Sequence, residues 1–381
     1  MKQLLIIAIA LTSVNAFATR ARTTALGNAA HLTDVQTVYT RPSAIFKLSG
    51  DYVNMETGSV TGTTADCDTS TVAIEPCTAQ NTNAEAMIVK TMGDAKMGLS
   101  LGHQSELFST WGLRSALGSF MAVGAPAANQ QNPIELTYGM QSGDMMWAGT
   151  LVYSNYNDKL AAVNNMEKES STGLRLGVDS GAWDGSLRLG LVNTVDVKTA
   201  TTSAKFTGTL GVEGDVGYTM DSLYFSGGLT MAGFKYEDTS GAVRKYDRSD
   251  YRVSATNSIK KDGNEFFFGA GLNMTSSKET VTDAKVTSTT LPVFLGLEVE
   301  AASWLTLRGS VKQATLINSS KKETATTVNY EYAPGNNTTT VALGAGLKFN
   351  KLNFDGTLST GSTQKVNSSD LMGQVGMSYW F

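Results

Sequence analysis

Long apolar runs and histidine are both scarce in this sequence, and each scarcity excludes a class of protein. Beyond the extreme N-terminus, no apolar run reaches the roughly 20 residues that a membrane-spanning helix needs. His31 and His103 are the only histidines among 381 residues, and no G-x-S-x-G, H-E-x-x-H or phosphate-binding motif accompanies them. We therefore expect neither a helical membrane protein nor an enzyme, and no catalytic residue, metal site or cofactor.

Basic charge and cysteine are also in short supply. The chain carries 30 Lys and Arg against 34 Asp and Glu, so it offers no basic patch and we expect no nucleic-acid partner. Its two cysteines, Cys67 and Cys77, lie in a polar stretch with neither a C-x-x-C redox motif nor enough ligands for a metal. In an exported protein, we expect this pair to form a disulfide that pins a loop.

The N-terminus has the three parts of a secretory signal peptide. Lys2 supplies the basic part, residues 4–14 the apolar part, and Ala16-Phe17-Ala18 an A-x-A cleavage site. The apolar part is too short for a membrane-anchoring helix. We expect residues 1–18 to be removed, so that the mature chain begins at Thr19.

From residue 44 to the C-terminus, the sequence repeats one pattern. Segments of about 9 to 13 residues with alternating hydrophobicity are separated by connectors that are alternately short and long. In one such segment, Trp183, Leu187 and Leu189 share one face, whereas Asp184 and Arg188 share the other. The pattern predicts an all-β fold, a transmembrane antiparallel up-and-down β-barrel of about sixteen strands, with about fourteen as the alternative count.

Other β architectures fit the pattern less well. A soluble sandwich would show Greek-key connections without a rhythm of short and long connectors, and a propeller would repeat a blade of about 40 to 50 residues. A strand-built membrane protein must close into a barrel, because the bilayer offers no water to open sheet edges. We therefore expect an outer-membrane barrel over 44–381, and an N-terminal segment over 19–43 that is either periplasmic or a plug.

The polar rows of the strands give the candidate lumen. A barrel of about sixteen strands leaves an aqueous lumen unless a loop or plug fills it. Both signs of charge occur in similar numbers, so we expect a transverse field without a net preference for one sign of ion. Arg175 and Arg188 form a basic patch on one inner wall, or alternatively pair with nearby acids. The candidate pore-lining residues are Lys47, Asp51, Glu135, Arg175, Asp184, Arg188, Lys205, Glu213, Asp215, Arg252, Glu298, Arg308, Lys312, Lys348 and Asp355.

One long connector is too apolar for an open loop. The stretch "ELFSTWGLRSALGSFMAVGAPAANQQ" contains apolar residues at helical spacing. We expect it to fold into the lumen as a constriction loop, with a capture site at the outer mouth and a subunit contact as the alternatives. Its candidate constriction residues are Trp111, Leu113, Leu117, Phe120 and Met121.

The chain ends "LMGQVGMSYWF", in which Val375, Met377, Tyr379 and Phe381 alternate on one face. This ending resembles the C-terminal signature of Gram-negative outer-membrane barrels, and as a whole the chain resembles the major outer-membrane proteins of predatory bacteria. The resemblance implies location in the outer membrane, with its lipid and lipopolysaccharide as neighbours. It also implies that the barrel-assembly machinery recognises these four residues as an assembly signal.

The stretch "ALGNAAHLTDVQTVYTRPSAI" is similar to the N-terminal region of the long-chain fatty-acid transporter family. The family pattern A-L-G-G-A, then acidic residues, then Tyr and N-P-A is matched at 25–27, Ala29, Tyr39, Pro42 and Ala44. Asn28 replaces the second Gly, Arg41 replaces the Asn, and Ser43 intervenes before Ala44. The resemblance implies a plug inside a barrel of about fourteen strands.

These observations lead to a functional expectation with two rivals. We expect a porin that allows passive diffusion of small hydrophilic solutes and ions, and analogy with porins implies a homotrimer. The first rival is a transporter of hydrophobic molecules with an N-terminal plug. The second is a structural or adhesion barrel that acts through its surface loops. Sixteen strands around an empty lumen favour the porin, and a filled lumen favours the transporter.

Overall fold

The computed structural model describes residues 19–58, 84–103, 133–160, 165–198, 203–237, 240–280, 285–318, 320–324, 327–331, 337–362 and 371–381. Cys67, Cys77 and the candidate constriction residues 111–121 lie outside the described residues, so the disulfide and the constriction loop stay predictions. Among the helices of the described residues, none is long and apolar enough to cross a membrane.

Almost all of the described chain is β-strand. Three short helical elements come first: α2 (Arg20–Ala25), α3 (Val35–Thr40) and the 3-10 helix η1 (Pro42–Phe46). The strands are β1 (Tyr52–Gly58), β2 (Glu85–Met92), β3 (Ala95–Leu101), β4 (Ile134–Ser142), β5 (Met145–Leu160), β6 (Asn165–Asp179), β7 (Trp183–Lys198), β8 (Ser203–Gly208), β9 (Gly211–Met220), β10 (Leu223–Glu237), β11 (Val243–Lys261), β12 (Asn264–Glu279), β13 (Lys285–Ala302), β14 (Leu305–Asn318), β15 (Ser320–Thr324), β16 (Thr327–Glu331), β17 (Thr338–Phe349), β18 (Leu352–Ser362) and β19 (Leu371–Trp380).

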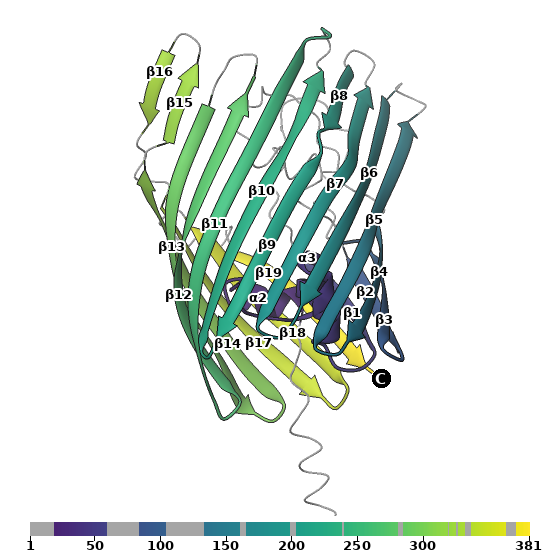
Figure 1. Ribbon diagram of the computed structural model, residues 1–381, viewed down its shortest axis with the longest axis vertical. Helices are drawn as coiled ribbons and strands as arrows, with labels where there is room; N and C mark the ends of the chain where they lie inside the picture. Colours follow the sequence, from purple (N-terminus) through teal and green to yellow (C-terminus); the bar gives the residue numbers. More distant parts are fainter. Residues whose placement is uncertain are drawn as a thin grey trace, which may run out of the picture.

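The strands close into one barrel (Figure 1). Each strand runs antiparallel to its neighbours. The first strand, β1, pairs with the last, β19, from Tyr52 opposite Trp380 to Gly58 opposite Gln374, and this pairing closes the barrel. β8 and β9 both pair with β7 and β10, so they are two parts of one interrupted barrel strand. The β15–β16 hairpin follows β14 and pairs with β13 at the rim. Counted in this way, the described residues form a barrel of sixteen strands, which confirms the predicted up-and-down barrel and the predicted number of strands.

Side chains alternate between two chemically different faces of the wall. On β4, the exposed Ile134, Leu136 and Tyr138 alternate with the buried Glu135 and Thr137. The same alternation runs around the described wall, so the outside is apolar and the inside is polar. On β19, Val375, Tyr379 and the following Phe381 are exposed on the outer face. An apolar band around a closed barrel is the surface that a lipid bilayer requires.

Residues 19–48, here called the inner segment, lie inside the wall. Figure 1 shows α2 and α3 enclosed by the barrel at the end where the C-terminus lies. Asp34 caps α3, since its side chain accepts a hydrogen bond from the Thr37 backbone N–H at 3.2 Å. In return, the Asp34 backbone N–H donates to the Thr37 hydroxyl at 3.0 Å, which completes a capping box. Pro42 begins η1, where its missing N–H costs nothing.

A hydrophobic core joins the inner segment to the wall. Val35, Val38, Ile45 and Leu48 are all at most 1% exposed. They belong to one cluster with wall side chains of β1, β2, β5 and β19, namely Tyr52, Met87, Val89, Ala148 and Trp380. Burying aliphatic side chains against one another stabilises the docked position of the segment.

The prediction that Lys205 lines the lumen is wrong. On β8, Ala204 and Phe206 are buried, whereas Lys205 between them is exposed and therefore lies on the outer face. The reason is an irregularity in two neighbouring strands of the barrel. β7 has a register shift near Leu191, and the strand that pairs with it is interrupted at 209–210, between β8 and β9. A bulge moves every later side chain to the opposite face.

Candidate functional site

An arginine–acid cluster lies on the inner wall, contributed by β7, β9 and β11. The Arg252 guanidinium contacts Glu213 Oε1 and Asp215 Oδ1, both at 2.5 Å. Arg188 lies opposite Glu213 in the strand register, pairs with it, and also reaches Asp215 at 3.4 Å. Gly228 of β10 lies between Asp215 and Arg252, where any added Cβ would overlap both side chains. The missing side chain at Gly228 therefore allows the two charges to meet across an intervening strand.

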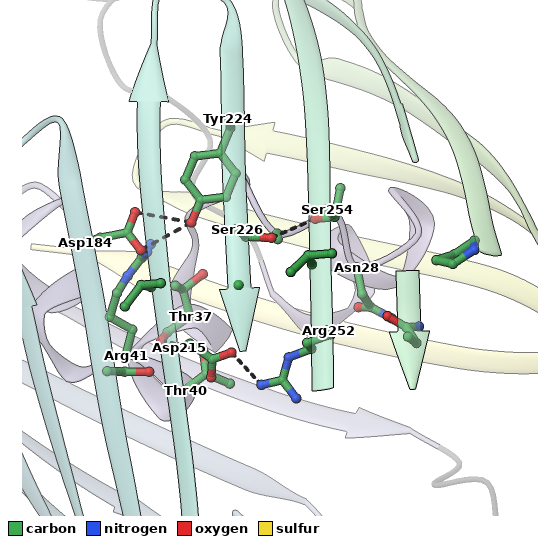
Figure 2. Close-up of a pocket in the computed structure, with 18 of the residues that line it drawn as sticks. Asn28, Thr37, Thr40, Arg41, Asp184, Asp215, Tyr224, Ser226, Arg252 and Ser254 are labelled. Atoms are coloured by element: carbon green, nitrogen blue, oxygen red, sulfur yellow. Dashed lines mark hydrogen bonds and ion pairs between the residues drawn. The ribbon is translucent and has the colours of Figure 1, made fainter. Parts of the chain in front are cut away.

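A second contact ties the inner segment to the same wall. Arg41 forms an ion pair with Asp184 of β7, and the Tyr224 hydroxyl of β10 donates to the Asp184 carboxylate at 3.2 Å. Figure 2 shows Arg41, Asp184 and Tyr224 together on one side, with Asp215 and Arg252 below. Burial acts to lower the pKa of Arg41, but Asp184 and Tyr224 together raise that pKa above its ordinary value.

Between these groups lies a cavity of about 350 Å³, here called the charged cavity. One side is the inner segment and the other is the wall from β7 to β14. Its polar lining comprises Asn28, Thr37, Thr40, Arg41, Asp184, Ser186, Arg188, Asp215, Tyr224, Ser226, Arg252, Ser254, Asn273 and Lys312. The lining can therefore solvate ions of either sign and offers many hydroxyl and amide groups to an uncharged polar solute.

Farther along the wall, on β13, β14 and β18, Arg22 of α2 enters a chain of charges. Its Nε and Nη2 atoms donate to Glu298 of β13 at 2.8 and 3.0 Å, in bidentate geometry. Arg308 of β14 donates to the same carboxylate at 2.6 Å and to Asp355 of β18 at 2.5 Å. Burial acts to lower the pKa of Arg22, yet the net shift is upward because Glu298 stabilises the cation. The wall alone supplies two acids, Glu298 and Asp355, and one cation, Arg308. Arg22 of the inner segment supplies the second cation of this network.

Other polar contacts hold the rest of the segment. His103 and Arg175 both bind the Glu135 carboxylate, the first through Nδ1 at 2.8 Å. Tyr39 stacks on the His103 ring at 3.7 Å between centroids and hydrogen-bonds Ser100 at 2.7 Å. The sequence left open whether Arg175 forms a basic patch or pairs with acids, and the structure shows that it pairs.

The C-terminal end of the segment is held from two sides. Lys47 pairs with Asp179 of β6 at 2.6 Å. The Lys96 ammonium of β3 donates to the carbonyl oxygens of Leu48 at 2.5 Å and Ile45 at 3.2 Å. A buried cation at the end of η1 satisfies carbonyls that the helix leaves unpaired.

Glycines shape the seat of the segment. A Cβ on Gly344 of β17 would lie 2.6 Å from the Ala25 Cβ, and one on Gly177 of β6 would lie 2.7 Å from the Ser43 backbone nitrogen. Gly139 of β4 bears the same relation to Phe46 at 2.7 Å. At these positions the segment approaches the wall so closely that no side chain fits.

The remaining predicted residues fall in different places. Lys312 lines the charged cavity, and Lys348 is on the inward face of β17 near its end. Asp51 lies just before β1, and its carboxylate binds Lys90 at 2.5 Å. Lys90 lies on the outer face of β2, so Asp51 belongs to the rim and not to the lumen. The reason is that Asp51 precedes the strand, so the alternation of inward and outward residues does not apply to it.

Several residues of these networks were not predicted from the sequence. They are Arg22, His31, Arg41, Asp179, Tyr224 and Glu265, with His31 and Glu265 in contact at 3.0 Å. Arg41 carried one signal, because it departs from the resembled family pattern. Among the described residues, no group of acids, histidines or cysteines forms a metal site.

Comparison with known proteins gives similarity at the level of fold. No protein-family model and no curated protein matches the chain. A FadL homologue of Pseudomonas aeruginosa is similar over 96% of this chain and 98% of its own, with 10% identity and a TM-score of 0.45. A porin is similar over 87% of this chain and 99% of its own, with 10% identity and a TM-score of 0.39. CdiB from Acinetobacter baumannii has 9% identity and a TM-score of 0.45; the match covers 87% of this chain and 60% of CdiB.

The fold is that of an outer-membrane β-barrel. Its closed antiparallel wall and apolar exterior support that statement without the comparisons. The resembled groups, porins and fatty-acid transporters, both recur among the similar structures. At about 10% identity, these similarities concern the fold and not the function.

Proposed function

We propose that the protein is an outer-membrane channel through which small polar and charged solutes diffuse, along the charged cavity beside the inner segment. The observation that carries this proposal is the lining of that cavity, which presents charged and hydroxyl side chains from both of its sides, beside apolar residues such as Val216 and Phe294. An apolar solute in this position would strip water from the charged groups without replacing their hydrogen bonds, which is costly. A polar solute replaces part of that water.

The inner segment determines how the channel works. It occupies part of the lumen that the described wall encloses, so we expect a conductance well below that of an unobstructed barrel of this size. The arginine–acid cluster lies on one wall of the route, where Arg188 and Arg252 pair with Glu213 and Asp215. Fixed charges on the wall of a channel orient dipolar solutes and tune selectivity between ions.

Lys312 makes the proposal sharper. It lines the cavity half-buried, and no ion pair of its side chain is found among the described residues. Its uncompensated positive charge favours anions in the route. We therefore expect Lys312→Gln to shift the reversal potential under a salt gradient toward cation selectivity. Lys205→Gln is the matched control, because Lys205 lies on the outer face and its loss leaves the cavity unchanged.

The decisive experiment is single-channel conductance of the refolded protein in planar bilayers at two salt concentrations. We expect small stepwise openings that scale with bulk salt, and a selectivity change with Lys312→Gln but not with Lys205→Gln. Folded barrels without any conductance would reject the proposal. So would openings that respond equally to the two substitutions.

The second candidate is a transporter of hydrophobic molecules, which two observations favour. The lumen holds the inner segment, and an aromatic cluster of Phe206, Phe234 and Tyr246 lies on the inward face of β8, β10 and β11. Saturable binding of a fluorescent apolar ligand that Phe234→Ala abolishes, in barrels that do not conduct, would select this candidate over the channel.

A further inference from the structure

Two acidic residues face each other on the inner wall. Glu56 of β1 lies directly opposite Glu85 of β2 in the strand register, and they are 7% and 6% exposed. Like charges in directly opposed positions destabilise a sheet, and burial removes the water that would screen them. Such a pair needs positive charge from elsewhere in the molecule.

The described residues supply only one cation to this pair. Arg20 donates to Glu85 Oε2 at 2.8 Å, and Gln36 donates to Glu85 Oε1 at 2.6 Å. Glu56 accepts hydrogen bonds from neutral donors, the Arg20 backbone N–H at 2.8 Å, the Asn54 amide at 2.8 Å and the Gln36 side chain. The Arg20 guanidinium donates to Glu85 and acts on Glu56 only through its charge. When both acids are ionised, the site carries two carboxylates and one guanidinium, so that either a proton on Glu56 or one further cation is needed to balance it.

Thr19 directly precedes Arg20, whose backbone N–H binds the Glu56 carboxylate. It is completely buried against Gly376 of β19, where any added Cβ would overlap the Thr19 side chain. Its backbone is extended, with ψ at 177°, so its nitrogen lies about 3.6 Å from the Arg20 nitrogen that already binds Glu56. The Thr19 hydroxyl is buried without a hydrogen-bond partner among the described residues.

We propose that the α-ammonium group created by cleavage between Ala18 and Thr19 is the missing cation, and that Glu56 binds it. Hydrolysis of that peptide bond consumes one water, leaving a carboxylate on Ala18 and an ammonium on Thr19. Before cleavage, the Thr19 nitrogen is a neutral amide, so an ionised Glu56 has no cation of its own. After cleavage, the site is neutral and the N-terminus is fixed in the barrel. Removal of the signal peptide thus completes the docking of the inner segment.

The proposal rests on the expected cleavage site, which mass spectrometry of the protein from outer membranes tests first. A mature N-terminus at any residue other than Thr19 would overturn the proposal, whatever the conductance of the channel. Conductance that fails while the N-terminus is Thr19 would count against the proposed channel and leave this inference standing.

The main test is a charge rescue. Mature protein beginning at Thr19 is compared with the same chain acetylated on its α-amine before refolding, using hydrogen exchange of the α2 amides. We expect exchange at least several-fold faster in the acetylated chain, because Glu56 then lacks its cation. Glu56→Gln in the acetylated chain should restore slow exchange, since the site is then neutral again.

Two further measurements make the outcome specific. Glu169→Gln is the matched control, because Glu169 is a buried inward acid that accepts from Ser154 and lies on β6, away from the N-terminus. It should rescue nothing. The pKa of the α-amine, followed by NMR, should exceed the ordinary value of about 8 and return toward it in Glu56→Gln. Equal exchange in the free and acetylated chains, or an ordinary α-amine pKa in the mature protein, would overturn the proposal.

Discussion

The two faces of the barrel wall come from alternate residues of the same strands. The choice of residue on the inner face depends on particular partner residues much more than the choice on the outer face does. On β14, Leu307 is 47% exposed on the outer face. The next residue, Arg308, is 5% exposed and donates to Glu298 and Asp355 on two other strands. Many apolar side chains would suit the first position. Only a side chain that reaches two particular carboxylates suits the second.

This difference explains the arrangement of the protein. The outer face meets a surrounding medium that is the same at every position, so its residues are interchangeable. The inner face meets one folded segment, so each inward residue is matched to a particular partner. Gly344 matches Ala25, Asp184 matches Arg41, and the Glu298 carboxylate matches Arg22.

The largest expected effect comes from charging the outer face. Leu307→Arg should lower the free energy of unfolding in lipid vesicles by ~2 to 4 kcal/mol, because the cation is moved into hydrocarbon. Urea titration of the folded barrel measures it. Leu307→Phe is the control and should leave stability nearly unchanged, since it stays apolar. Equal stability of the arginine variant and the original protein would mean that the outer and inner faces are reversed.

The next effect comes from filling the seat of the inner segment. Gly344→Val should destabilise the docked segment by ~1 to 3 kcal/mol through overpacking against Ala25, and the conductance should rise as the segment moves away. Gly356→Val is the control, because a Cβ there meets nothing within 4 Å. Combining Gly344→Val with Ala25→Gly should recover part of the loss. Identical conductance in both valine variants would show that the segment does not narrow the route.

The same contrast decides how much was predictable from the sequence. The period of two at Leu187 and Arg188, and the alternation of short and long connectors, led to the barrel, its strand number and its outer face. These features are local, so they appear in any window of the chain. Lys205 was misplaced because the irregularities near Leu191 and at 209–210 shift the alternation without any obvious signal in composition.

The inner networks were predicted only by residue type. Charged residues on polar rows were expected in the lumen, and Glu135, Arg188 and Glu298 are there. Their partners were not foreseen, because Arg22 and Glu298 are 276 residues apart and only the closed barrel brings them together. Pairing across such separations is a tertiary property that no local pattern encodes.

The smallest effect concerns a single buried acid in the inner segment. Asp34 is completely buried, and burial raises its pKa to about 7 although Arg22 lies 4.0 Å away and acts in the opposite direction. Of the other charged or titratable groups around it, Asp355 raises its pKa further, and Tyr52 lies close enough to interact with it. A carboxyl whose pKa is raised by docking binds its proton more tightly in the docked state. Docking is therefore fully favoured below the ordinary pKa near 4 and is weakened as the pH rises through 7.

Between pH 6 and pH 8, the equilibrium constant for docking of the inner segment should fall by about tenfold. Open probability in planar bilayers, recorded at both pH values, measures this change. Asp34→Asn keeps a side chain that can cap α3 but cannot ionise, so its open probability should be independent of pH over this range. A pH response that persists in Asp34→Asn would assign it to another group. In that case Asp34 would stabilise the inner segment only by capping α3. The inner face would still differ from the outer face in having a particular partner for each residue, but Asp34 would not make it sensitive to pH.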